Sequence, residues 1–120
     1  MILADTSVWV DHLRSGEARL AELLGAGRVV AQRSERDFRD DERMRDRAGV
    51  LSLLDGLPSL PVAGEEEVRV LIEERRLFGR GVGVVDVSLL AACLLVPGTF
   101  IWTRDRKLDA VAREVGVALG

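Results

Sequence analysis

The chain has 120 residues, of which 48% are hydrophobic and 31% are charged, and its formal net charge is −3. These values are typical of one globular domain over residues 1–120, and they exclude a protein that binds nucleic acid through an overall positive charge. No apolar run approaches the ~20 residues of a membrane-spanning helix, and no export signal precedes the first strand. We therefore expect a cytoplasmic protein without membrane contact. The single cysteine, Cys93, excludes an internal disulfide and is expected to be buried.

The first quarter of the sequence is typical of an α/β fold. Residues 2–4 predict a buried strand, and a short helix over 8–13 is expected to begin once Thr6 or Ser7 caps it. A second helix is predicted over 17–24, ended by glycines, and a second strand over 28–31. This order of strand, helices and strand predicts a parallel sheet with right-handed crossovers.

Residues 33–47 differ from everything around them, with six arginines and six acidic residues in fifteen positions. Only Phe38 and Met44 are apolar there, so the segment has no apolar face to pack on a sheet. We expect a solvated helix or partial disorder over this range.

Helical and strand patterns return in the second half of the chain. A helix is predicted over 50–57 and another over 65–75, whose acidic start at Glu65–Glu67 favours capping of the helix over a metal cluster. The helix expected over 86–95 is apolar nearly all round, which predicts a deep position or a subunit contact. A strand over 99–103, a helix with an apolar face from Leu108 to Val115 and a short strand over 117–119 follow.

Three aspartates share a context, because each follows a short apolar run. They are Asp5, Asp86 and Asp105, and the runs before them cover 2–4, 84–85 and 100–103. The carboxyl ends of adjacent parallel strands lie at one edge of a sheet, where open α/β folds place their sites. We therefore expect the three carboxylates to meet in one pocket, beside the hydroxyls of Thr6, Ser7 and Thr103.

Carboxylates that lie so close repel one another unless a cation or protons intervene. Oxygen ligands favour Mg²⁺ or Mn²⁺, and the lack of histidine and cysteine ligands argues against zinc. Such an ion polarises a phosphodiester and activates a water molecule. The pattern therefore predicts metal-dependent phosphate chemistry. A phosphotransferase is disfavoured, because no Asp-x-Asp motif follows the first strand.

Three segments resemble PIN-domain ribonucleases of the VapC type, which are toxins of toxin–antitoxin pairs. These segments are Asp-Thr-Ser-Val-Trp-Val-Asp-His-Leu from position 5, Gly-Arg-Gly-Val-Gly-Val-Val-Asp-Val-Ser-Leu-Leu-Ala from position 79 and Trp-Thr-Arg-Asp-Arg-Lys-Leu from position 102. The likeness covers residues 1–31 and about 45–120. It implies a three-layer α/β fold with a central parallel sheet of four or five strands. It also implies a Mg²⁺- or Mn²⁺-dependent endoribonuclease that forms a homodimer and is inhibited by a VapB-type antitoxin.

The resemblance assigns roles to particular residues. Asp5, Asp86 and Asp105 match three of the family's acidic positions, so they are the expected metal ligands and catalytic residues. Thr6 and Ser7 are expected to orient ligands or water at the substrate. Apart from the resemblance, Arg104 is a candidate to hold RNA phosphates, with Arg80 and Arg106 as further candidates, and the alternative is that these arginines are solvated surface residues.

One acidic position of the family is missing. The family usually carries Gly-Glu-Leu after the second strand, and counting back from the matching residues 45–47 places Phe38 where that Glu is expected. Asp37, Asp41 and Glu42 are the nearby acids that could replace it. The alternative prediction is therefore a catalytically impaired PIN-like module that binds an antitoxin without efficient cleavage.

Overall fold

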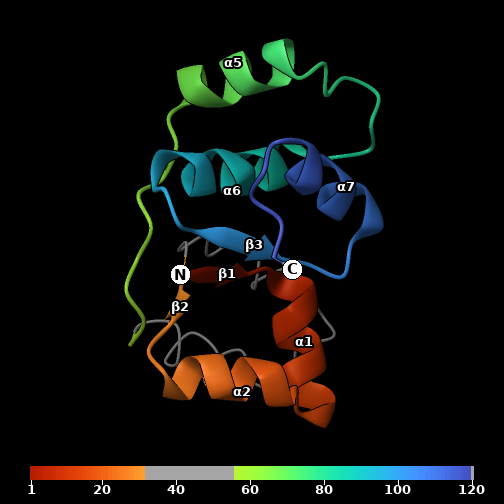
Figure 1. The fold of residues 1–120 in the computed structure, drawn as a ribbon. Coiled ribbons are helices and arrows are strands. Elements are labelled where there is room, and N and C mark those ends of the chain that lie inside the picture. The colour runs from red at the N-terminus through yellow and green to blue at the C-terminus, as the bar shows by residue number, and fades with distance from the viewer. Residues whose placement is uncertain (32–55, 120) are drawn as a thin grey trace.

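The computed structural model describes residues 1–31 and 56–119. Within them, a parallel sheet has the strand order β2-β1-β3, with β1 (Ile2–Ala4) between β2 (Val29–Val30) and β3 (Phe100–Trp102). Leu3 of the central strand pairs with Val30 on one side and Ile101 on the other. Helices cover both faces of this sheet, so the predicted α/β architecture with a parallel sheet is confirmed (Figure 1).

The sheet is narrower than the four or five strands expected, because the described residues contain three strands. Beyond each edge, one isolated parallel bridge continues the pairing: Ala31 pairs with Ser59, and Ile101 pairs with Ala118. Prolines at 58 and 61 flank Ser59 and have no N–H to donate, which limits further pairing there. The strand predicted over 117–119 is likewise reduced to this bridge.

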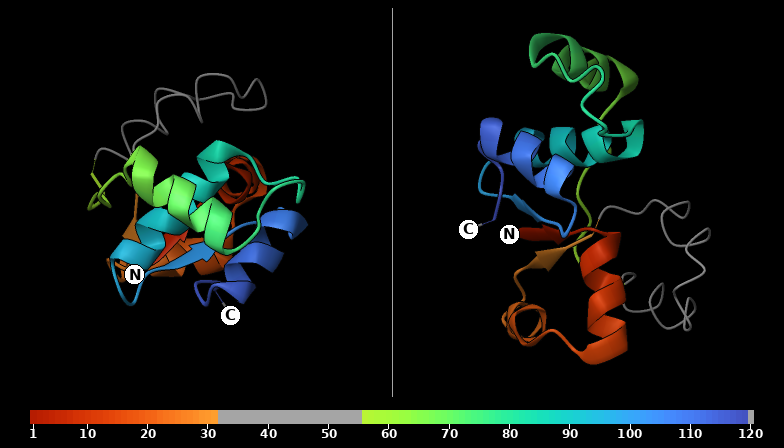
Figure 2. Two further views of the ribbon diagram at one scale, coloured as in Figure 1. Left: turned by 90° about the horizontal axis from the view of Figure 1, so that it is seen from above. Right: turned by 90° about the vertical axis from the view of Figure 1, so that its right-hand side faces the viewer.

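Among the described residues, two helices lie on one face of the sheet and two on the other, with a further helix outside them. On one side are α1 (Thr6–Ser15) and α2 (Ala18–Gly25), and on the other are α6 (Val84–Leu95) and α7 (Arg106–Glu114). The further helix, α5 (Glu65–Glu74), lies across α6 as an outer layer (Figure 1). Figure 2 shows the same stacking from two other directions.

Within the described part of the chain, the core forms two apolar clusters. The larger cluster includes Leu3, Leu90 and Ile101, and it fills the space between the sheet and α5, α6 and α7. The smaller cluster, around Trp9 and Leu20, packs α1 and α2 against the other face. Helix α6 contributes a run of buried side chains from Leu89 to Cys93, which confirms its predicted deep position. Cys93 is buried and free, also as expected.

Several predicted boundaries were wrong by a few residues. Helix α1 begins at Thr6 instead of residue 8, because Asp5 is its N-cap and not Thr6 or Ser7. Helix α6 begins at Val84, so the two valines before Asp86 form its first turn and not a strand end. The charged segment 33–47 and most of the helix expected over 50–57 lie outside the described residues. Among the described helices, none combines the length and the apolar character needed to cross a membrane.

Candidate active site

Asp5 lies where β1 passes into α1, and its carboxylate is held by the first turn of that helix. Its backbone is extended, and Oδ1 accepts hydrogen bonds from the Ser7 amide at 3.0 Å and the Val8 amide at 3.4 Å. The Ser7 hydroxyl donates to the same oxygen. These donors, together with the positive end of the helix dipole, fix a half-buried negative charge at this point.

Thr103 connects Asp5 to the end of the neighbouring strand. Its hydroxyl donates to Oδ2 of Asp5 and accepts a hydrogen bond from the Asp105 amide at 3.0 Å. The Arg104 amide donates to the Ser7 hydroxyl at 2.9 Å, and the Asp5 amide donates to the Trp102 carbonyl at 3.0 Å. The turn after β3 is therefore joined to the turn after β1 through both backbone and side chains.

Asp105 repeats at β3 what Asp5 does at β1. It is the N-cap of α7, and its Oδ1 accepts from the Lys107 amide at 2.9 Å and the Leu108 amide at 3.2 Å. Because β1 and β3 are adjacent and parallel, the two caps lie at the same edge of the sheet. The sequence predicted the shared edge for these two acids, but not that both cap helices.

Asp86 belongs to another layer of the fold, on α6. It is half-buried in the first turn of α6, which begins on the side where β1 and β3 end (Figure 1).

The glycine-rich segment before Asp86 is joined to α7, because Arg80 makes two hydrogen bonds to the Glu114 carboxylate at 2.8 and 2.9 Å. These hydrogen bonds lower the pKa of Glu114 below its ordinary value. The guanidinium of Arg80, a further candidate to hold RNA phosphate, is therefore engaged by Glu114.

The donor chemistry at this edge suits a hard divalent cation, because the side-chain atoms offered are carboxylate and hydroxyl oxygens. The described residues nevertheless contain no group of three or more His, Cys, Asp or Glu side chains placed to hold a metal ion. Asp5 and Asp105 are linked through Thr103, while Asp86 does not complete such a group with them. The assignment of the three acids as metal ligands stays a prediction, as do the roles of Thr6 and Ser7.

Arg104 is held by acidic side chains that the sequence analysis did not single out. Its Nε lies 3.0 Å from Oδ2 of Asp11 on α1, and its Nη2 lies 2.6 Å from Oε2 of Glu17, the N-cap of α2. Its guanidinium carbon lies 5.6 Å from the centre of the Trp102 ring. No local sequence pattern joins positions 11, 17 and 104, so these contacts were not predictable without the fold.

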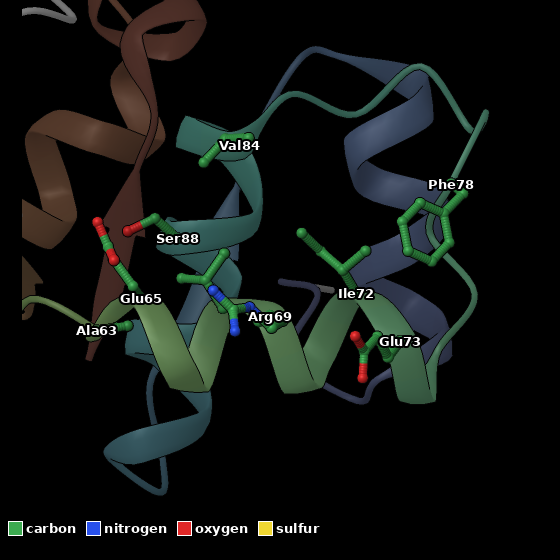
Figure 3. A pocket seen from close by; sticks show the side chains of 9 residues that line it. Ala63, Glu65, Arg69, Ile72, Glu73, Phe78, Val84 and Ser88 are labelled. Carbon is green, nitrogen blue, oxygen red and sulfur yellow. The ribbon is translucent and has the colours of Figure 1, made fainter.

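A cavity of about 540 Å³ opens between α5 and the start of α6 (Figure 3). Its walls include Val68 and Ile72 of α5 and Val84 and Ser88 of α6, with Phe78 at one end. Phe78 and Val84 are 72% and 70% exposed, which is unusual for large apolar side chains. The lining is mainly apolar but also includes the charged side chains of Glu65, Arg69 and Glu73.

Two curated relatives match nearly the whole chain. Both are named ribonuclease VapC32, from Mycobacterium tuberculosis strains CDC 1551 / Oshkosh and ATCC 25618 / H37Rv. Each is 45% identical over 119 residues, which cover 99% of this chain and 96% of the relative. No family model matches the sequence.

Proposed function

Because the chain belongs to the VapC family of ribonucleases, we propose that it is a Mg²⁺- or Mn²⁺-dependent endoribonuclease and the toxin of a toxin–antitoxin pair. The observation that carries this proposal is the pair of aspartates at the ends of adjacent parallel strands, joined through Thr103, in a chain so similar to a named ribonuclease. Its substrate is RNA, which is cut at the phosphodiester.

In this mechanism Asp5 is the central metal ligand, and Asp105 and Asp86 complete the acidic site. A Mg²⁺ ion needs only one or two direct carboxylates, since it keeps several waters. When bound, it would polarise the phosphate and make a bound water more acidic. Ser7 and Thr103 hold the two Asp5 oxygens in fixed directions, so little reorganisation is needed when the substrate arrives.

A chain with a net charge of −3 needs a local way to bind the phosphates of RNA. Helices α1 and α7 begin at this edge, but amides of their first turns already donate to the capping carboxylates of Asp5 and Asp105. We therefore propose that the phosphodiester would be held mainly through the metal ion. Thr6, whose hydroxyl lies in the first turn of α1, is proposed to orient the substrate or water there.

The decisive test is the variant Asp5→Asn. Asparagine caps a helix about as well as aspartate, so the variant should fold normally, yet it lacks the charge of the ligand. We expect the wild type to cleave RNA with Mg²⁺ or Mn²⁺ and the variant to be inactive, as measured on a labelled RNA by gel electrophoresis. Asp109→Asn is the matched control, because Asp109 bonds Arg113 on the surface of α7. Undiminished cleavage by Asp5→Asn, or by the wild type in excess chelator, would overturn the proposal.

A binding module without efficient cleavage is the second candidate function. It is favoured by Phe38 at the position of the family's glutamate and by the lack of a three-acid metal group among the described residues. Calorimetric titration with Mn²⁺ separates the two, because a folded protein that releases no heat favours the binding module. Phe38→Glu should then create metal binding and raise cleavage. If the wild type already binds Mn²⁺ and cleaves RNA, this second function is rejected.

We further propose that the chain forms a homodimer and binds a VapB-type antitoxin. Support comes from the exposed apolar side chains around α5 and α6, among them Phe78, Val84 and Leu95, which a protein partner would cover. Light scattering after size-exclusion chromatography measures the oligomeric state, and co-purification with a VapB-type antitoxin measures the second interaction. A monomer that retains no antitoxin would contradict both.

A further inference from the structure

One arginine meets three elements next to the proposed active site. Arg104 lies in the turn between β3 and α7, and its guanidinium is paired with Asp11 of α1 and Glu17 at the start of α2. Its backbone amide donates to the Ser7 hydroxyl, which in turn donates to Asp5. The same residue is therefore one hydrogen bond from the side chain that holds the central carboxylate.

One partner of this guanidinium, Glu17, belongs to an anchored corner of the fold. The Glu17 amide donates to Nδ1 of His12 at 3.0 Å, which closes the corner between α1 and α2. The His12 ring meets the buried Trp9 ring edge to face, with centroids 6.1 Å apart. The Glu17 side chain is the less exposed of the two acids, at 27% against 50% for Asp11. Arg104 is thus bound to a corner that is anchored in the smaller core cluster.

The charges argue against RNA phosphate as the partner of Arg104. With Asp11 and Glu17, the arginine forms a group whose formal net charge is −1. A phosphate would have to displace a carboxylate from a guanidinium fork that already bonds both acids. Because its guanidinium already bonds two carboxylates, Arg104 is better suited to hold protein segments together than to bind RNA.

We propose that Arg104 is a positioning residue: through Asp11 and Glu17 it holds the β3–α7 turn against α1 and α2, so that Ser7 and Thr103 keep the Asp5 carboxylate aligned. The inference rests on the proposed ribonuclease function for its kinetic consequences, although the clamp itself does not. Exposed ion pairs contribute little to the free energy of unfolding. Loss of the clamp should therefore alter alignment and leave the fold intact.

The double variant Asp11→Asn/Glu17→Gln gives opposite results for the two roles. If Arg104 positions the turn, kcat should fall about 10- to 100-fold, the size of effect that a displacement of ~1 Å produces, while KM and the salt dependence of cleavage stay unchanged. If Arg104 binds phosphate, removing two competing negative charges should lower KM and steepen the salt dependence. Arg104→Ala added to the double variant should cause little further loss, because the three side chains act as one unit.

Arg113→Ala is the matched control, because Arg113 forms a comparable surface ion pair with Asp109 elsewhere on α7. It should leave kcat, KM and salt dependence unchanged. Arg104→Ala should lower kcat as the double variant does. Arg104→Lys should have a kcat between those of Arg104→Ala and the wild type, since lysine keeps the charge but lacks the planar fork. Full activity of Arg104→Ala, or a lower KM in the double variant, would overturn the inference.

A second readout does not depend on cleavage. Amide hydrogen exchange, followed by NMR, should accelerate at the Arg104 and Asp105 amides in the double variant, because these amides donate to Ser7 and Thr103. Exchange at both positions should be unchanged in Arg113→Ala. If the wild type cleaves no RNA, the proposed ribonuclease function is rejected. The exchange rates would still test whether Arg104, Asp11 and Glu17 hold the turn. Unchanged exchange in a folded double variant would reject the clamp.

Discussion

At the residue scale, Asp5 and Asp105 each have two roles. Both cap a helix, and both are proposed to hold the metal ion that RNA cleavage requires. Helix caps are strong where a side-chain oxygen accepts from the second or third amide of the helix, as both aspartates do. Capping therefore places both carboxylates at the sheet edge, where they are proposed to act in chemistry.

Cys93 provides a pH-dependent prediction at the same scale. Burial raises the pKa of its thiol from 9.0 to about 12. The unfolded chain releases this proton at its ordinary pKa and the folded chain does not, so the contribution to stability is complete below about pH 9 and is lost as pH rises toward 12. We expect the free energy of unfolding of the wild type to fall more steeply over this alkaline range than that of Cys93→Ala.

Denaturant titrations at several alkaline pH values measure this difference. The variant has a lower stability at neutral pH because it leaves a small cavity, so the slopes with pH are compared and not the absolute values. A control at pH 6 to 8, below the ordinary pKa of the thiol, should give parallel curves. Parallel curves throughout the alkaline range would show that the thiol ionises as readily in the folded protein as in the unfolded one.

At the scale of elements, the stability of α7 allows the capping role of Asp105 to be measured separately from its proposed catalytic role. Asp105→Ala removes the acceptor for the Lys107 and Leu108 amides and should cost about 1 kcal/mol in the free energy of unfolding, whereas Asp105→Asn should cost only a few tenths. Both variants should lose RNA cleavage, because neither keeps the carboxylate. Thermal or chemical unfolding beside a cleavage assay checks the pair. Full activity of Asp105→Asn would show that capping is the only role of this residue.

Local patterns in the sequence predicted the elements better than their ends. The apolar faces of α2, α5 and α7, the buried strand β1 and the strand β3 follow from residue spacing alone. The start of α6 was misjudged, because a pair of valines before Asp86 is compatible with a strand or with a helical turn. The isolated bridge at Ser59 joins positions 28 residues apart in the sequence, and its pairing depends on tertiary context that spacing does not contain.

At the candidate site, too, local patterns predicted some features while others depend on tertiary context. Asp5 and Asp105 were predicted at one edge because each follows an apolar strand, and that part depends only on strand direction. The hydrogen bond from Thr103 to Asp5 and the ion pairs of Arg104 connect residues 87 to 98 positions apart. Such pairs are fixed by strand register and by the corner between α1 and α2, which no local pattern specifies.

At the scale of the whole molecule, the sheet separates two apolar clusters that must fold together for the acidic edge to form. Leu90 is fully buried in the larger cluster and Trp9 is buried in the smaller one. Leu90→Ala should lower the free energy of unfolding by about 2–5 kcal/mol. If unfolding is two-state, the fluorescence of Trp9, measured in a Trp102→Phe background, should report this loss from the opposite face of the sheet.

Leu13→Ala is the matched control, on α1 and outside the surface proposed for a partner. Leu13 is 43% exposed, so its loss should change the free energy of unfolding by about 0.5 kcal/mol or less. A Trp9 transition that Leu90→Ala leaves unshifted, while circular dichroism detects a weakened α6, would mean that the two faces unfold separately.

The combination of helix capping and proposed metal binding in Asp5 and Asp105 has a genetic consequence. A single base change converts an aspartate codon into an asparagine codon, and asparagine keeps the cap while it removes the carboxylate. In cells that express an RNA-cleaving chain, growth selects for inactive alleles. Among survivors that still accumulate folded protein, Asp5→Asn and Asp105→Asn should therefore recur, and such alleles would preserve every surface that a partner protein recognises.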